Sequence, residues 1–372
     1  MRATLERAQF LRPLTHVYRV VERRNTIPIL SNVLIRSNGS ALSLKATDLD
    51  LEVVESVDAL VEVAGATTVP AHMLHDIVRK IPEGAQIRLE TSPDGSTMTL
   101  SAGRSRFSLQ MLPESDYPDI TAGQFSNSFT IRSADLKRLV DRTQFAISTE
   151  ETRYYLNGIY LHTVSTPDGT MLRAVATDGH RLAQAEIPAP AGSDGMPGVI
   201  VPRKTVGEVQ RLLETPDEEV AVELSDSKIR FVIGPVVLTS KLIDGTFPDY
   251  VRVIPKANDK VLLVDREDFT RAVDRVSTVS SERGRAVKLS LSDGQLVLTV
   301  NNPESGMATD ELAADYDGPP LDIGFNSKYL LDIAGQTASE NVRFRLSDAG
   351  SPTLIEDTED PRLLFVLMPM RV

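Results

Sequence analysis

The sequence predicts an α+β fold in which one domain, two helices packed on antiparallel sheets, occurs three times in tandem. Three observations carry this prediction. Glycines at the tips of predicted hairpins recur at Gly39, Gly169 and Gly294, which are 130 and 125 residues apart. An amphipathic segment precedes each hairpin, and a second helix and a second hairpin follow it. Self-similarity at a fixed period indicates a repeated structural unit.

The length of the chain fits three domains. Each copy of roughly 100 to 150 residues is long enough to bury a core of its own. We therefore divide the 372 residues into domains at 1–124, 125–254 and 255–372, with linkers near 121–128 and 254–260.

Two helices are predicted in each copy from apolar residues at spacings of three and four, which place one face of a helix in a core. The leading helices are expected at 5–17, 133–147 and 266–279. Ser133 and Asp265 have the short polar side chains that cap helix amino termini, so we expect them to cap the last two. The second helices are expected at 71–81, 203–213 and 326–335.

Two hairpins in each copy are predicted from alternating apolar and polar residues on both sides of a turn. In the first copy Asn38-Gly39 forms the first turn, because Asn-Gly supplies the positive φ angles that a tight turn needs. The matching turns are Pro167-Asp168-Gly169 and Asp293-Gly294. The second hairpins turn at 93–95, 226–227 and 349–350. The first two copies also close alike, at Tyr117-Pro118-Asp119 and Phe247-Pro248-Asp249.

The composition excludes several kinds of protein. The chain has no cysteine, which excludes a disulfide framework, a thiol nucleophile and a thiolate metal site. Its first residues lack the basic and apolar parts of a signal peptide. No apolar run approaches the roughly 20 residues that span a bilayer. We therefore expect a soluble cytoplasmic protein that does not enter membranes.

The motifs of common enzymes are missing from the sequence: it has no GxxxxGK[ST] loop, no GxGxxG, no GxSxG and no HExxH. His72 and His75 have a helical spacing that could hold a metal, but no third ligand lies near them in sequence, so ordinary surface or core roles are expected. Asp178 and His180 share one face of a strand, yet no nucleophile accompanies them. We predict no catalytic residue, no metal and no cofactor.

Basic residues recur at one position of the leading helices. They are Arg12 and His16, Arg138 and Arg142, and Arg271 and Arg275. They are either solvated helix faces paired with nearby aspartates or, because they recur three times, a surface for phosphates. The chain is acidic overall, with 52 acidic and 40 basic residues and a formal net charge of -12. A positive inner wall on such a protein would hold DNA by enclosure rather than by adhesion.

Eight motifs resemble those of the bacterial replicative sliding clamps, the β subunits of DNA polymerase III, and most of all the alphaproteobacterial ones. They are RRNTIPILSN (23–32), ATDLDLE (46–52), AGRSRFSL (102–109), EETRYYLNG (150–158), ATDGHRLA (176–183), FPDY (247–250), NNPE (301–304) and VLMPMRV (366–372). The resemblance covers all 372 residues. It implies DNA-clamp domains and a head-to-tail homodimer, a six-domain ring whose helices line a hole around duplex DNA and whose sheets form the outer wall.

The resemblance also implies binding residues. Arg24, Tyr154 and Tyr155 correspond to DNA-contacting positions, in addition to the arginines of the second and third leading helices; core packing is the alternative for the tyrosines. A pocket for partner peptides is implied between the second and third domains. Its positions here are Arg153, Leu156, Thr177, Gly179, His180, Arg181, Leu182, Pro248, Arg252, Val253, Asn326, Tyr329, Val366, Met368, Pro369, Met370 and Arg371. Leucine, valine, proline and methionine suit an apolar peptide side chain, while the arginines and His180 suit its polar groups.

A ring interface is implied as well, between two different surfaces of the chain. On the first domain it comprises Arg104, Arg106, Phe107 and Leu109, and on the third Thr278, Val279 and Glu304. An apolar centre flanked by opposite charges suits such a heterologous contact. Two residues depart from the family pattern. Thr278 stands where a larger aliphatic residue is expected, which bears on ring strength, and Pro352 stands where serine is expected at the pocket edge, which bears on ligand preference.

The sequence thus predicts a non-catalytic processivity clamp that is a subunit of the DNA polymerase III holoenzyme. It would tether the replicative polymerase α subunit, the clamp loader, other polymerases and repair proteins through linear peptides, which raises their local concentration on DNA. A partner that hydrolyses ATP must load the ring, because the sequence has no nucleotide motif. Two alternatives remain: a repeat-built adaptor that binds peptides but not DNA, and a hydrolase that uses Asp178 and His180.

Overall fold

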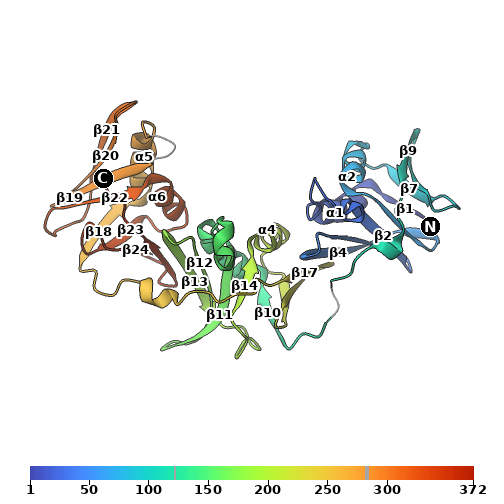
Figure 1. Ribbon diagram of the computed structural model, residues 1–372, viewed down its shortest axis with the longest axis horizontal. Coiled ribbons are helices and arrows are strands. Elements are labelled where there is room, and N and C mark those ends of the chain that lie inside the picture. Colours follow the sequence, from blue (N-terminus) through green and yellow to red (C-terminus); the bar gives the residue numbers. More distant parts are fainter. Residues whose placement is uncertain (121–122, 281–284) are drawn as a thin grey trace. The chain divides into compact units, whose positions relative to one another are not determined.

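The computed structural model describes residues 1–120, 123–280 and 285–372 (Figure 1). In this part of the chain the α-helices are α1 (Arg7–Tyr18), α2 (Ala71–Lys80), α3 (Ser133–Thr143), α4 (Arg203–Leu212), α5 (Arg266–Ser277) and α6 (Ser327–Ala334). Short 3-10 helices are η1 (Pro28–Ser31), η2 (Glu114–Asp116), η3 (Gln144–Ala146), η4 (Glu151–Leu156) and η5 (Tyr250–Val253).

The strands of the described residues form four antiparallel sheets. The first has the order β5 (Leu60–Val63), β1 (Arg2–Glu6), β7 (Gln86–Thr91), β8 (Thr97–Ala102), β9 (Ser105–Gln110). The second has the order β10 (Asn127–Arg132), β15 (Glu219–Leu224), β16 (Lys228–Ile233), β17 (Val236–Lys241), β4 (Leu51–Asp58), β3 (Ala41–Thr47), β2 (Asn32–Asn38), β6 (Ala66–Pro70). The third has the order β14 (Val199–Pro202), β11 (Gly158–Thr166), β12 (Gly169–Thr177), β13 (Arg181–Pro188), β25 (Leu363–Leu367), β24 (Thr353–Asp357), β23 (Asn341–Leu346), β18 (Lys260–Asp265). The fourth has the order β21 (Gly306–Ala313), β20 (Gln295–Asn302), β19 (Ala286–Ser292), β22 (Leu321–Asn326).

Two compact units make up the described chain. The first comprises Met1–Ala134 and Gly207–Leu242, and the second comprises Asp135–Val206 and Ile243–Val372. Each unit contains one eight-stranded sheet that combines strands of two predicted repeats. In the first unit β4 pairs with β17, and in the second unit β13 pairs with β25. The second repeat therefore contributes strands to both units.

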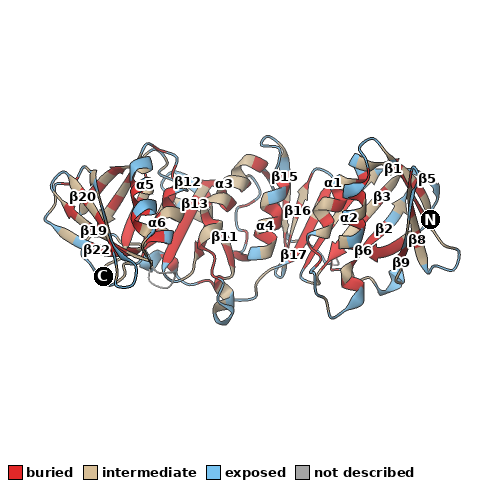
Figure 2. Ribbon diagram, turned by 90° about the horizontal axis from the view of Figure 1, so that it is seen from above, coloured by how far each residue is buried: buried red, intermediate tan, exposed pale blue. Residues whose placement is uncertain are grey.

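Burial alternates along the strands, as expected for sheets with one face in a core. In β3, β19 and β20 every second residue is buried (Figure 2). The helices turn apolar faces to the same cores: Phe10, Leu14 and Val17 of α1 are fully buried, and so are Ala272 and Val273 of α5. These packed layers position the helices, strands and turns that carry the candidate functional residues.

The predicted α+β fold with three copies is confirmed, and each predicted helix and hairpin is present. Helix bounds differ in detail. Helix α1 begins at Arg7 rather than at residue 5, because Leu5 and Glu6 belong to β1 and the Glu6 carboxylate accepts hydrogen bonds from Ala8 N (2.8 Å) and Gln9 N (3.2 Å). Helices α3 and α5 end earlier than predicted, at Thr143 and Ser277.

One of the two predicted helix caps is correct. Asp265 caps α5, since its carboxylate accepts a hydrogen bond from Asp268 N at 2.8 Å. Ser133 does not cap α3: it is the first residue of that helix, and its buried hydroxyl has no hydrogen-bond partner in the described structure. The positive φ of the first hairpin also falls on Gly39 alone, at +60°, because Asn38 ends strand β2.

Candidate functional site

A cavity of about 280 Å³ lies in the second unit. Four segments that are distant in sequence line it: η4, the turn between β12 and β13, η5 with the residues before it, and the end of β25. The lining residues are Arg153, Tyr155, Leu156, Thr177, Gly179, His180, Arg181, Leu182, Pro248, Asp249, Tyr250, Val253, Val366 and Met368. The structure thus brings together eleven of the seventeen residues that the sequence assigned to a peptide pocket.

The other six assigned residues lie outside the lining of this cavity. Arg252 is ion-paired with Asp249 at 2.6 Å, and Asn326 caps α6 by accepting a hydrogen bond from Lys328 N at 3.0 Å. The guanidinium of Arg181 lies over the ring of Tyr329, with Arg181 Cζ 4.2 Å from the ring centroid. The remaining three are Pro369, Met370 and Arg371, in the segment where Met370 N donates to Gly324 O at 2.7 Å.

Three lining residues were not assigned to the pocket from the sequence. Asp249 and Tyr250 belong to the FPDY motif, which was a sufficient signal to include them. Tyr155 was assigned to DNA but lines this cavity. Pro352 is not among the lining residues; its carbonyl accepts a hydrogen bond from Asn258 Nδ2 at 2.9 Å.

The floor of the cavity is apolar because β13 and β25 pair in a register that sets Leu182 opposite Val366. Both side chains belong to one buried cluster, whose other members are Leu156, Val175, Ile200, Phe247, Tyr250 and Leu354. At the mouth, Val253 and Met368 are 51% and 40% exposed. An apolar floor with a partly exposed apolar rim suits a side chain that enters from solvent.

A tight turn holds the polar side of the cavity. The carboxylate of Asp178 accepts hydrogen bonds from His180 N (2.9 Å) and Arg181 N (3.0 Å), and Gly179 occupies the left-handed region at φ +89°. Arg181 is held by Asp178 (3.1 Å) and by Asp332 (2.6 Å). The Asp178 carboxylate therefore shapes the turn and orients an arginine, and no described contact joins it to the imidazole of His180. The hydrolase alternative has no supporting geometry.

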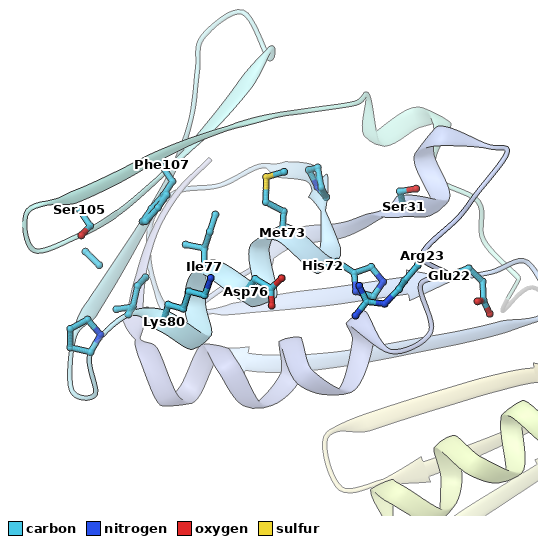
Figure 3. A pocket seen from close by; sticks show the side chains of 14 residues that line it. Glu22, Arg23, Ser31, His72, Met73, Asp76, Ile77, Lys80, Ser105 and Phe107 are labelled. Atoms are coloured by element: carbon cyan, nitrogen blue, oxygen red, sulfur yellow. The ribbon is translucent and has the colours of Figure 1, made fainter.

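A second cavity, of about 640 Å³, lies in the first unit. Figure 3 shows Phe107 of β9 and the α2 side chains Met73 and Ile77 around it. Met73 lines this cavity and is 52% exposed. Of the predicted interface residues, Phe107 lines this cavity, Leu109 is buried in the same strand, and Arg104 and Arg106 are exposed beside it.

The predicted interface residues of the third repeat lie near one another within the second unit. Thr278 is the exposed residue at the carboxyl end of α5, and Val279 follows it. Asn302 joins Val279 to the turn that carries Glu304: its Nδ2 donates to Val279 O at 2.9 Å, and its Oδ1 accepts from Glu304 N at 3.1 Å.

The predicted DNA-binding arginines of the helices already have acceptors within the chain. Arg138 donates to Glu186 O (2.7 Å) and to the Asp360 carboxylate (2.6 Å), and Arg142 donates to Gln336 O. On α5, Arg271 pairs with Glu267 (2.8 Å) and Arg275 with Asp310 (2.7 Å).

The remaining candidates for DNA contact differ in exposure. Arg24 is exposed, and no ion pair of it occurs within the described residues. Tyr154 is 54% exposed and packs edge-on against Tyr155. In the first repeat the second basic residue of the recurring pair, His16, does not face solvent. Its Nδ1 lies 2.6 Å from Oε2 of the buried Glu55 carboxylate.

The close histidine pair has structural partners. His75 stacks on Tyr18 with ring centroids 3.8 Å apart, burial lowers its pKa, and His72 Nε2 lies 2.8 Å from Val21 O. Within residues 1–120, 123–280 and 285–372 no group of three histidine or acidic side chains is placed to hold a metal. Across the same residues, no helix combines the length and apolar character needed to cross a membrane.

Family models match nearly the whole chain. They describe the N-terminal, central and C-terminal domains of the DNA polymerase III beta subunit and match residues 1–121, 130–249 and 251–371. Among relatives, the chain is 53% identical over 372 residues to the beta sliding clamp of Caulobacter vibrioides and 42% identical over 376 residues to that of Escherichia coli K12, with 100% of each chain covered.

Solved structures agree with this match. The DnaN sliding clamp of Bartonella birtlesii bound to griselimycin is 60% identical, with a TM-score of 0.97 and 100% of both chains covered. The beta sliding clamp of Caulobacter crescentus with bound PEG is 53% identical, with a TM-score of 0.98 and coverage of 100% of this chain and 99% of that chain.

Proposed function

The chain belongs to the DNA polymerase III beta subunit family, and we propose that its 280 Å³ cavity is the site where linear peptides of partner proteins dock. It is a sliding clamp without chemistry of its own, a processivity subunit that forms a homodimeric ring around duplex DNA and tethers the polymerase. The partners we propose are the polymerase α subunit, the clamp loader, and other polymerases and repair proteins.

The observation that carries the peptide site is the meeting of four distant segments around an apolar floor. The cavity of about 280 Å³ is about twice the 150 Å³ that encloses a benzene ring, so it has room for about two apolar side chains. Burying each one contributes roughly 1.5 to 3 kcal/mol. Arg153 and His180 at the rim supply donors for the peptide's carbonyl or carboxylate groups.

Griselimycin is a defined probe for this site. It is bound to the Bartonella birtlesii clamp, which is 60% identical to this chain. We propose that griselimycin binds in the 280 Å³ cavity of this chain, which combines an apolar floor with polar side chains. One molecule per chain is the expected stoichiometry, and partner peptides should compete with it.

The DNA contact is proposed to depend on enclosure. With a formal net charge of -12, the chain as a whole repels a polyanion, so a closed ring rather than general adhesion would retain DNA. We assign the inner contacts to Arg24, Tyr154 and the helical arginines. A guanidinium has five N–H donors, so each of those arginines would bind phosphates with the N–H groups that its internal hydrogen bonds do not use.

Domain limits and location complete the proposal. We propose limits at 1–124, 125–254 and 255–372, in support of which β10 begins at Asn127 and β18 at Lys260. We also propose a cytoplasmic protein that associates with the nucleoid through the DNA it encloses.

The test pairs a pocket variant with a matched control. Val253 and Met368 both line the rim and are partly exposed, so changing both to alanine should leave the fold intact. Val251 lies on η5 with Val253 and is 44% exposed, but it does not line the cavity, so Val251→Ala is the control. With the Caulobacter clamp loader and polymerase on a primed circular template, the double variant should give short products and bind griselimycin weakly. If it performs as well as Val251→Ala, the peptide-site assignment is wrong.

A further inference from the structure

A polar network lies behind one wall of the peptide cavity. Tyr250 lines the cavity and is only 6% exposed. Its hydroxyl oxygen is 3.0 Å from Arg173 Nη1 and 3.0 Å from His162 Nε2, and neither of these residues lines the cavity. We propose that Arg173 and His162 are positioning residues for the bound peptide: they fix the Tyr250 ring as a rigid wall of the cavity. This inference rests on the proposed peptide site.

The direction of each hydrogen bond follows from what the groups can do. Arginine only donates, so the Tyr250 oxygen accepts from Arg173 and its proton is donated to His162 Nε2. That leaves a proton on His162 Nδ1, which faces Thr163 O at 3.1 Å. Burial lowers the pKa of His162 and raises the pKa of Tyr250, so the imidazole stays neutral and the phenol keeps its proton. Each group in the chain of contacts has one defined role.

Both ends of the network are anchored in the third sheet. Arg173 on β12 is held by Glu186 on β13, with Nε and Nη2 at 2.8 and 2.7 Å from Oε2. His162 on β11 stacks on Tyr160 with ring centroids 4.5 Å apart, and Tyr160 stacks in turn on Phe247 at 4.9 Å. The hydroxyl of Tyr250 therefore contacts two side chains that are themselves held in place, Arg173 by an ion pair and His162 by ring stacking.

The other repeats form the same hairpin without this network. His162 and Arg173 are cross-strand partners. His162 lies four residues after Gly158, and Gly158 pairs with Pro202, the residue just before the second helix of the repeat, α4. The equivalent cross-strand pairs are Arg36 with Ser43 in the first repeat and Ser290 with Val297 in the third. Where the second repeat has FPDY, the first has YPDI, which ends on an isoleucine without a hydroxyl.

This comparison separates a structural role from a binding role. The hairpin does not need the network to fold, since two other copies lack it. The side chains of the Arg173–Glu186 pair are also each only 14% exposed. Burying an ion pair costs hydration free energy, and the attraction between the two charges often does not offset that cost. The hairpin fold therefore does not require the network, which occurs in the repeat whose FPDY segment lines the peptide cavity.

A double-mutant cycle on griselimycin affinity tests the proposal. Tyr250→Phe removes the hydroxyl but keeps the ring, and His162→Phe keeps a ring against Tyr160 but removes the acceptor. Each single change should weaken griselimycin binding by about five- to tenfold, mainly through faster dissociation, and the double variant should be no worse than either single one. Arg36→Phe, at the equivalent hairpin position of the first repeat, is the control and should bind like wild type.

Each outcome decides the question. Singles within twofold of wild type, or losses that multiply in the double variant, would overturn the positioning role. If His162→Phe does not fold, Tyr250→Phe, which deletes one oxygen, decides by itself. If wild-type protein binds no griselimycin, the proposed peptide site fails; if wild type binds and the variants bind equally well, only the positioning role fails.

Discussion

Replacing Phe107 by alanine should open the ring. Phe107 lines the 640 Å³ cavity of the first unit beside the half-exposed Met73, and it lies on β9, an edge strand of its sheet. We propose that this cavity accepts the partner chain's third domain. A head-to-tail dimer closes through two such contacts, so one substitution removes the side chain from both of them.

The size of the effect follows from burial. Burying a phenylalanine contributes roughly 1.5 to 3 kcal/mol, so two interfaces lose about 3 to 6 kcal/mol. At about 1.4 kcal/mol per tenfold, the dimer Kd would rise by roughly 10² to 10⁴. Phe107 is already half-buried within a single chain, so we expect the lower end, about a hundredfold.

Sedimentation over a concentration series measures that Kd. The control is Leu60→Ala, because Leu60 is 66% exposed on β5, the opposite edge strand of the same sheet. Its Kd should equal that of wild type. A change below tenfold for Phe107→Ala, or an equal change for Leu60→Ala, would refute the assignment of this cavity to the ring interface.

Three further changes test other parts of the structure. Lys45→Met leaves the fully buried Glu52 without the ammonium at 3.0 Å, a loss of about 3 to 5 kcal/mol. Burial raises the pKa of Glu52 and Lys45 opposes that rise, so without Lys45 the folded state binds the Glu52 proton more tightly than in wild type. The loss in thermal stability should therefore be larger at pH 7.5 than at pH 5, and equal losses would contradict this. Arg24→Glu should shorten the lifetime of loaded rings on DNA at an unchanged melting temperature. Arg138→Glu should lower both the lifetime and the melting temperature, because it places a second carboxylate beside that of Asp360. Unchanged lifetimes would exclude these contacts. Thr278→Leu should lower the dimer Kd about tenfold in sedimentation, because each added buried CH₂ contributes ~0.8 kcal/mol and the contact occurs twice in the ring. An unchanged Kd would place Thr278 outside the contact.

The local elements could be predicted from the sequence because local chemistry specifies them. Gly39, Gly169 and Gly294 lie in turns at φ +60°, +115° and +69°, conformations that glycine adopts without strain. Strand β1 was missed because Leu5 and Glu6 fit a helical pattern as well as a strand, and only pairing with β7 decides between them. Pairing between repeats, β4 with β17 and β13 with β25, depends on contacts that no local pattern contains.

The candidate site was predictable to a similar degree. The ATDGHRLA motif identified the turn, but the use of the Asp178 carboxylate by the backbone of that turn requires coordinates. The recurrence of Arg138 and Arg142 left open whether they pair with nearby aspartates or face phosphates, whereas the structure gives each an internal acceptor supplied by a distant segment. Tyr250 has the same limitation, since a buried tyrosine reveals its role only when its hydroxyl partners are known.

The most direct test of the clamp account is retention on DNA. The protein would be loaded onto nicked circular plasmid with a clamp loader and ATP, washed in moderate salt, and followed after the circle is cut once. A closed ring predicts that the protein stays on circles and runs off linear molecules. Equal loss from circular and linear DNA, with loading verified by a relative such as the Caulobacter clamp in parallel, would contradict topological enclosure.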